Sequence, residues 1–176
     1  MGKLTTAGLL LATAALAGCF KSQAPLISVF EGQAPIPSGI YTYTEDNATK
    51  QVAVSVDWPA TVVTESKPDG SLEVDRYYMR AVKDGFYVAM DKSNNYGLVR
   101  VASDQVVLYE ASDNCYLLQG LGEVPEETEA TYDVDISGDD ESSTCTFKDF
   151  GNLAQAYSDL IDDGSLKVAR TYVRRQ

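Results

Sequence analysis

Histidine is absent from the 176-residue chain, and its absence excludes several classes of active site. A Ser-His-Asp or Cys-His nucleophile system cannot be assembled, and the usual His-containing zinc sites are excluded too. Carboxylates, lysine and tyrosine remain as groups for acid–base chemistry. The chain also lacks a glycine-rich phosphate loop, a Gly-x-Ser-x-Gly elbow and a Cys-x-x-Cys pair. We therefore expect a non-catalytic protein.

Basic residues are few, which excludes another class of partner. Lysine and arginine total 14 against 26 acidic residues, so the formal net charge is −12. A surface this acidic repels phosphates, and we expect no nucleic-acid partner.

Long apolar runs are absent except at the N-terminus. After Lys3, residues 4–16 carry no charge, but the run is shorter than the about 20 apolar residues that a membrane span needs. A cation, an apolar run and closing small residues are typical of a secretory signal. The run ends in Leu16-Ala17-Gly18-Cys19.

These four residues resemble the lipobox of bacterial lipoproteins. The resemblance implies that diacylglycerol alkylates the Cys19 thiol, that residues 1–18 are removed, and that the new amine is acylated. Two or more acyl chains would hold the protein stably on a membrane. The residue after the cysteine is Phe20 rather than Asp, which resembles the outer-membrane sorting pattern. The implied location is the cell envelope, at the periplasmic face of the outer membrane in a Gram-negative host.

Two other interpretations of the N-terminus stay open. Gly2 to Thr6 fits an N-myristoylation pattern, although that pattern leaves the following apolar run unexplained. An ordinary signal peptide followed by a chance cysteine is the second.

Cys115 and Cys145 are an even pair once Cys19 is lipidated. In an exported protein such a pair predicts a disulfide. Closing a loop of 145 − 115 = 30 residues would stabilise the fold by about 3–4 kcal/mol. Two unpaired thiols are the alternative.

Cleavage before Cys19 would leave 176 − 18 = 158 residues, enough for one domain with a core. Residues 19–38 contain Pro25, Pro35 and Pro37, and proline favours an extended tether that holds the domain off the bilayer. Docking of Leu26–Phe30 on the domain is the alternative.

Residues 39–110 alternate apolar and polar side chains between short turns, which predicts β-strands. Seven strands are expected, at 40–44, 51–57, 60–65, 72–82, 86–90, 96–101 and 105–110. After them, Phe150 to Ile161 has a helical apolar face, with Asp149 as cap and Gly164 as stop. Leu166 to Tyr172 alternates again.

The predicted fold is mainly β (α+β). Residues 39–176 would form a single domain, an antiparallel meander or small barrel of about seven to nine strands with a C-terminal helix.

Residues 120–142 are strongly acidic and predict a solvated loop. Asp133, Asp135 and Asp139 resemble the opening of an EF-hand calcium loop, but Thr144 stands where that loop needs a bidentate glutamate. A weak calcium site on the three aspartates is the alternative. Apart from the covalent lipid, we expect no other cofactor.

Eleven tyrosines and Trp58 indicate either a packed β core or an aromatic binding face. The sequence favours a lipid-anchored binding module, with the membrane as one partner and an envelope protein or small ligand as another. A carboxylate-dependent enzyme acting on cell-wall glycan is the second hypothesis.

Overall fold

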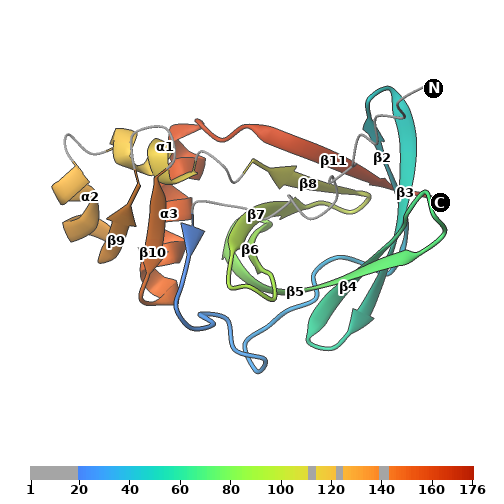
Figure 1. Ribbon diagram of the computed structural model, residues 1–176, viewed down its shortest axis with the longest axis horizontal. Helices are drawn as coiled ribbons and strands as arrows, with labels where there is room; N and C mark the ends of the chain where they lie inside the picture. The colour runs from blue at the N-terminus through green and yellow to red at the C-terminus, as the bar shows by residue number, and fades with distance from the viewer. Residues whose placement is uncertain (1–19, 111–113, 122–124, 139–142) are drawn as a thin grey trace, which may run out of the picture.

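The computed structural model describes residues 20–110, 114–121, 125–138 and 143–176. Their main feature is a closed, eight-stranded antiparallel barrel with a helical layer on one side (Figure 1). The strand order around the barrel is β11-β2-β3-β4-β5-β6-β7-β8. The bounds are β2 Gly39–Glu45, β3 Ala48–Asp57, β4 Ala60–Ser66, β5 Leu72–Lys83, β6 Phe86–Met90, β7 Tyr96–Val101, β8 Gln105–Tyr109 and β11 Val168–Arg174. The predicted mainly β fold is confirmed.

The last strand closes the barrel. β11 pairs antiparallel with β2, where Val173 faces Thr42, and with β8, where Thr171 faces Val107. Without β11, both β2 and β8 would present unpaired edges. Of the two predicted arrangements, the barrel is therefore the one that forms.

Tight turns connect the hairpins where the sequence predicts them. Asp46 and Asn47 join β2 to β3, and Asp84 and Gly85 join β5 to β6; all four have positive φ values, between 41° and 81°. Such backbone angles match the twist of two-residue hairpin turns. These turns fix the register and so decide which side chains face inward.

A second layer packs outside β6 and β7. It contains α1 Asn114–Leu121, α2 Pro125–Tyr132, α3 Phe150–Asp163 and a small sheet of β1 Phe20–Lys21, β10 Thr144–Phe147 and β9 Val134–Ser137. α3 begins as predicted, because the Asp149 carboxylate accepts a hydrogen bond from the Asn152 N–H, and it ends at Gly164. None of the helices in the described part of the chain has the length and apolarity to cross a membrane.

The two remaining cysteines meet inside this layer. Cys115 of α1 and Cys145 of β10 are fully buried, and their sulfur atoms are 2.11 Å apart. The bridge fastens α1 to the small sheet.

The prediction of a solvated loop at 120–142 is wrong for most of that range. α2 and β9 occupy it, and Thr128, Tyr132 and Val134 are buried. The Tyr132 hydroxyl donates to an Asp159 carboxylate oxygen of α3 over 2.8 Å. Glu127, Glu129, Asp133 and Asp135 are exposed, while these few buried residues anchor the segment. Residues 122–124 and 139–142 lie outside the described part of the chain.

The expected free tether is also wrong for residues 20–38. Phe20, Ile27 and Ile36 are buried, and the segment runs from β1 beneath the barrel to the start of β2 (Figure 1). β1 pairs in parallel with β10, so that Phe20 stands beside Cys145. Buried apolar residues spaced along the segment hold it against the domain. The alternative of docking at Leu26–Phe30 holds in part, because Ile27 is buried.

Phe20→Ala and Phe30→Ala test this docked segment. The Phe20 ring lies 4.9 Å from the Phe147 ring and 5.0 Å from the Tyr157 ring. Its removal should lower the free energy of unfolding by about 3–5 kcal/mol. Phe30 is 95 % exposed, and its removal should change that free energy by less than about 0.5 kcal/mol. Urea unfolding measures both, and equal effects would contradict the docked arrangement.

Candidate functional site

The barrel interior contains a cavity of about 90 Å³. Because side chains of a strand alternate between its two faces, one set from each strand points inward. The cavity is lined by Ile36, Tyr41, Val52, Val54, Val63, Tyr77, Met79, Ala89, Val99, Val106, Leu108 and Tyr172. Eight strands enclose a space that side chains just fill or that holds one small ligand.

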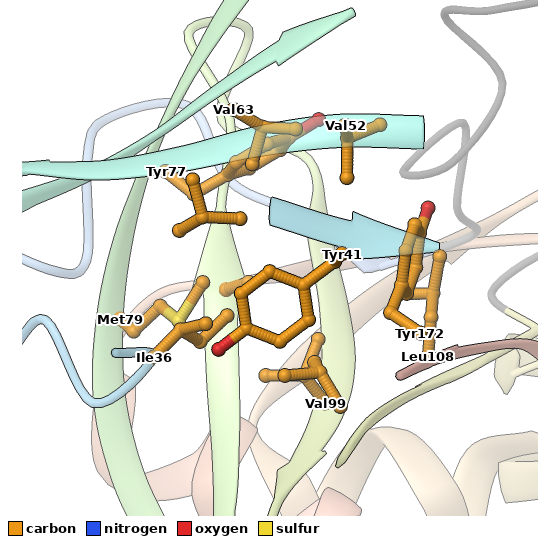
Figure 2. Close-up of a pocket in the computed structure, with 12 residues that line it drawn as sticks. Ile36, Tyr41, Val52, Val63, Tyr77, Met79, Val99, Leu108 and Tyr172 are labelled. Atoms are coloured by element: carbon orange, nitrogen blue, oxygen red, sulfur yellow. The ribbon is translucent and has the colours of Figure 1, made fainter. Parts of the chain in front are cut away.

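Three tyrosine rings give the cavity its aromatic character. In Figure 2, Tyr41 lies across the middle, between Val52 and Val63 on one side and Val99 on the other. Tyr77 and Tyr172 come from β5 and β11. The remaining lining is aliphatic apart from Met79, so the cavity suits an apolar group.

The segment before β2 covers one end of the barrel. The Gln33 N–H donates to the Met79 carbonyl over 2.7 Å, and Ile36 reaches into the cavity lining. The Tyr41 hydroxyl donates to the Pro37 carbonyl over 2.9 Å. This end is therefore closed by residues 33–38.

Polar side chains occupy the opposite end, where β2 finishes at Glu45. The Glu45 carboxylate forms ion pairs with both Lys50 and Arg170. The Arg170 guanidinium lies 4.4 Å from the centre of the Tyr43 ring. The Tyr43 hydroxyl donates to a Glu65 carboxylate oxygen over 2.7 Å. Lys50 and Arg170 thus offset the charges of Glu45 and Glu65 within this group.

The pKa values of this group follow from these contacts. The hydrogen bond from Lys50 lowers the pKa of the Glu45 carboxyl. Burial raises the pKa of the Tyr43 hydroxyl, and its bond to Glu65 raises it further. At neutral pH the carboxylate is ionised and the phenol keeps its proton.

Glu73, Asp75 and Tyr77 alternate along β5 and share the face of Met79, which lines the cavity. Opposite Asp75 on β4 is Val63, another lining residue. Among the described residues, no lysine or arginine nitrogen lies within ion-pair distance of Asp75. Burial, and next the charge of Glu73, raise the pKa of the Asp75 carboxyl. Asp75 is thus the least compensated carboxylate at the edge of the cavity.

The site residues predicted from sequence lie elsewhere. Cys19 and Asp139 fall outside the described part of the chain. The Lys148 ammonium is 2.9 Å from an Asp133 carboxylate oxygen and 3.5 Å from one of Asp135. Within the described ranges no group of three side chains is arranged to hold a metal. The calcium site at Asp133, Asp135 and Asp139 stays a prediction.

The sequence indicated part of the barrel site. The number of tyrosines indicated a packed core or an aromatic face, and Tyr41 and Tyr43, which share one face of β2, are both buried inside the barrel. The signal that was missed is on β5, where Glu73 and Asp75 interrupt an inward face that continues as Tyr77 and Met79. Charged residues on the apolar face of a strand are unusual enough to mark a site.

Asp75→Asn should stabilise the ligand-free protein at pH 7. A carboxyl whose pKa is higher in the folded than in the unfolded chain binds more protons when folded. Its ionisation therefore lowers the free energy of unfolding as the pH rises from the ordinary pKa of an aspartate, which holds in the unfolded chain, towards the raised pKa of the folded chain. The variant should melt at a higher temperature than the wild type at pH 7, and the difference should vanish near about pH 4.

Thermal scans between these pH values measure the effect. Asp104→Asn controls for the lost charge, because Asp104 is an exposed residue of the β7–β8 turn at the closed end. A lower melting temperature of Asp75→Asn at pH 7 would mean that the ionised carboxylate has a stabilising partner.

The site has to be interpreted from its own residues. No protein-family model, curated protein sequence or solved structure matches the chain.

Proposed function

We propose that this chain is an exported lipoprotein, anchored through Cys19, whose barrel binds one small ligand with an apolar end. The observation that supports the proposal best is the aromatic and aliphatic cavity inside the barrel. Ligand sites are typically concave, mostly apolar and equipped with a few polar groups, and both kinds of side chain are present here. A binding module needs no reacting group.

The size of the cavity limits what enters it. Its volume of about 90 Å³ is below that of an apolar cavity of about 150 Å³ that binds benzene. Typical sites for drug-sized ligands enclose about 300–1,000 Å³. Only a short alkyl or similarly small apolar group fits, and the rest of the ligand would lie among the polar residues at the end of β2.

The docked N-terminal segment supports a location close to the membrane. Phe20 follows Cys19 directly and is buried in the helical layer. A lipid on Cys19 would therefore hold the folded domain against the bilayer without a flexible spacer. We assign the cell envelope as the location, at the periplasmic face of the outer membrane if the host is Gram-negative.

A glycan-cleaving enzyme is the weaker proposal. Such an enzyme needs one carboxylic acid and one free carboxylate on either side of the scissile bond. Glu45 forms ion pairs with two cations, and Glu65 accepts a hydrogen bond from the Tyr43 hydroxyl. These contacts favour a structural role for both side chains.

Cys19→Ser tests the anchor. The wild-type protein should sediment with membranes and incorporate labelled palmitate, whereas the variant should lose the label because serine has no thiol to alkylate. Nearly all of the Cys19→Ser variant should leave the membrane fraction, since two or more acyl chains account for stable binding. A variant that still sediments and still carries palmitate would rule out lipidation at this residue.

Binding of 3-methylbutan-1-ol tests the cavity. Titrated up to about 10 mM, this short branched alcohol should shift the methyl NMR signals of Val99 and Leu108, which line the cavity. Ala89→Val should weaken binding, because Ala89 lines the cavity and the larger side chain takes up its space. Ala53→Val is the matched control, since Ala53 alternates with the lining residues Val52 and Val54 and points outward.

Each outcome is decisive for the binding proposal. Shifts at Val99 and Leu108 that weaken only in Ala89→Val support it. Nuclear Overhauser contacts between the alcohol and these methyl groups in the wild type give a second readout if Ala89→Val unfolds. An absence of both shifts and contacts would overturn the proposal.

A further inference from the structure

We propose that the ligand of the barrel is a small organic cation, an alkylammonium ion whose apolar end fills the cavity and whose ammonium group meets Asp75 beside Glu73. This inference rests on the proposed binding function and adds the chemical class of the ligand.

The placement of Asp75 supports the assignment. Its register partner is Val63, and Tyr77 stands two residues further along the same face of β5. Both neighbours line the cavity (Figure 2). Directly opposed residues of antiparallel strands have Cβ atoms about 4.5–5.5 Å apart. The Asp75 carboxylate therefore lies at the edge of the cavity, where the polar end of a bound ligand would be.

The charges facing the barrel interior do not balance without a ligand. Four carboxylates, Glu45, Glu65, Glu73 and Asp75, face three cations that contact them, Lys50, Lys67 and Arg170, so the sum is 3 − 4 = −1. In the adjoining turn, Asp91 and Lys92 both act on Asp75 and add one charge of each sign. One positive charge from the ligand would neutralise the group.

The excess negative charge lies on β5. The Lys67 ammonium is 3.4 Å from Oε2 of Glu73, and that oxygen is buried without a hydrogen-bond partner among the described residues. Glu73 thus has one lysine within ion-pair distance, and Asp75 has none in the described part of the chain. An ammonium group has three N–H donors to offer the two carboxylates.

A further buried group lacks a partner on the neighbouring strand. Thr61 is directly opposite Tyr77 and shares the inward face of β4 with Val63. Its hydroxyl is fully buried and has no hydrogen bond in the described part of the protein. Buried hydroxyls are nearly always paired, but Thr61 does not line the cavity and lies deeper along β4 than Val63, so the ammonium group at Asp75 is not its partner. The Tyr77 and Tyr172 rings would add cation–π attraction for an ammonium ion.

An anionic ligand fits these residues less well. The Arg170 guanidinium is already held by Glu45 and by the face of the Tyr43 ring. A carboxylate or phosphate would have to displace Glu45 and would be repelled by Glu73 and Asp75.

Three probes with one apolar end and different head groups test the inference. 3-Methylbutylammonium is cationic, 3-methylbutan-1-ol is neutral and 3-methylbutanoate is anionic at pH 7. NMR titration should give a dissociation constant for the ammonium ion about tenfold lower than that for the alcohol, with the anion weakest. Asp75→Asn should reduce the affinity ratio of ammonium ion to alcohol to about one. Asp104→Asn, an exposed charge at the closed end, should keep the tenfold ratio.

The outcomes separate this inference from the proposed function. If the alcohol binds but the ammonium ion binds no tighter, or if Asp75→Asn keeps the preference, the cation assignment is wrong and the cavity still binds. If none of the three probes shifts the signals of Val99 and Leu108, the binding function itself fails. A preference that disappears only in Asp75→Asn supports the assignment.

Discussion

The pairing of β11 with both β2 and β8 is the interaction on which the other features of the barrel depend. It joins residues 131 positions apart, since the Thr42 hydroxyl donates to the Val173 carbonyl. The same pairing brings Arg170 and Tyr172 to the side of Glu45 and Tyr43. An open sheet would expose these groups to water. Only the closed barrel has an interior in which the charge and size of these side chains decide what can bind.

The route of the chain to β11 also explains the helical layer. The Glu110 N–H after β8 donates to the Lys167 carbonyl before β11, so the connection leaves and returns at one place. Between them, α3 covers the outer face of β6 and β7, where the Tyr157 hydroxyl donates to the Tyr96 carbonyl. β6 and β7 are therefore buried on both faces, with Val88 and Leu98 outside and Ala89 and Val99 inside. The layer supports the strands that form one wall of the cavity.

Sequence patterns predicted the strands well because each strand repeats locally every two residues. They could not predict closure, since nothing in the alternation of Val168 to Tyr172 says that both β2 and β8 will be its partners. The docked N-terminal segment was missed because its prolines dominate the composition, while Phe20, Ile27 and Ile36 are too widely spaced to form a period. The acidic segment misled in the same way: its described carboxylates Glu127, Glu129, Asp133 and Asp135 are exposed, and a few residues such as Tyr132 and Val134 anchor it.

Arg170 and Asp75, two charged residues on inward faces of the barrel strands, differ in whether the folded protein supplies a partner for their charge. Arg170 is half-buried and is compensated by Glu45 and by the face of the Tyr43 ring. Removal of either partner would leave its charge less well compensated. Asp75 has no such partner in the described part of the protein, and its ionisation opposes folding. A side chain that destabilises the empty barrel contributes nothing to packing that valine would not contribute better. The position of Asp75 beside the cavity is explained if the ligand brings the positive charge that pairs with it.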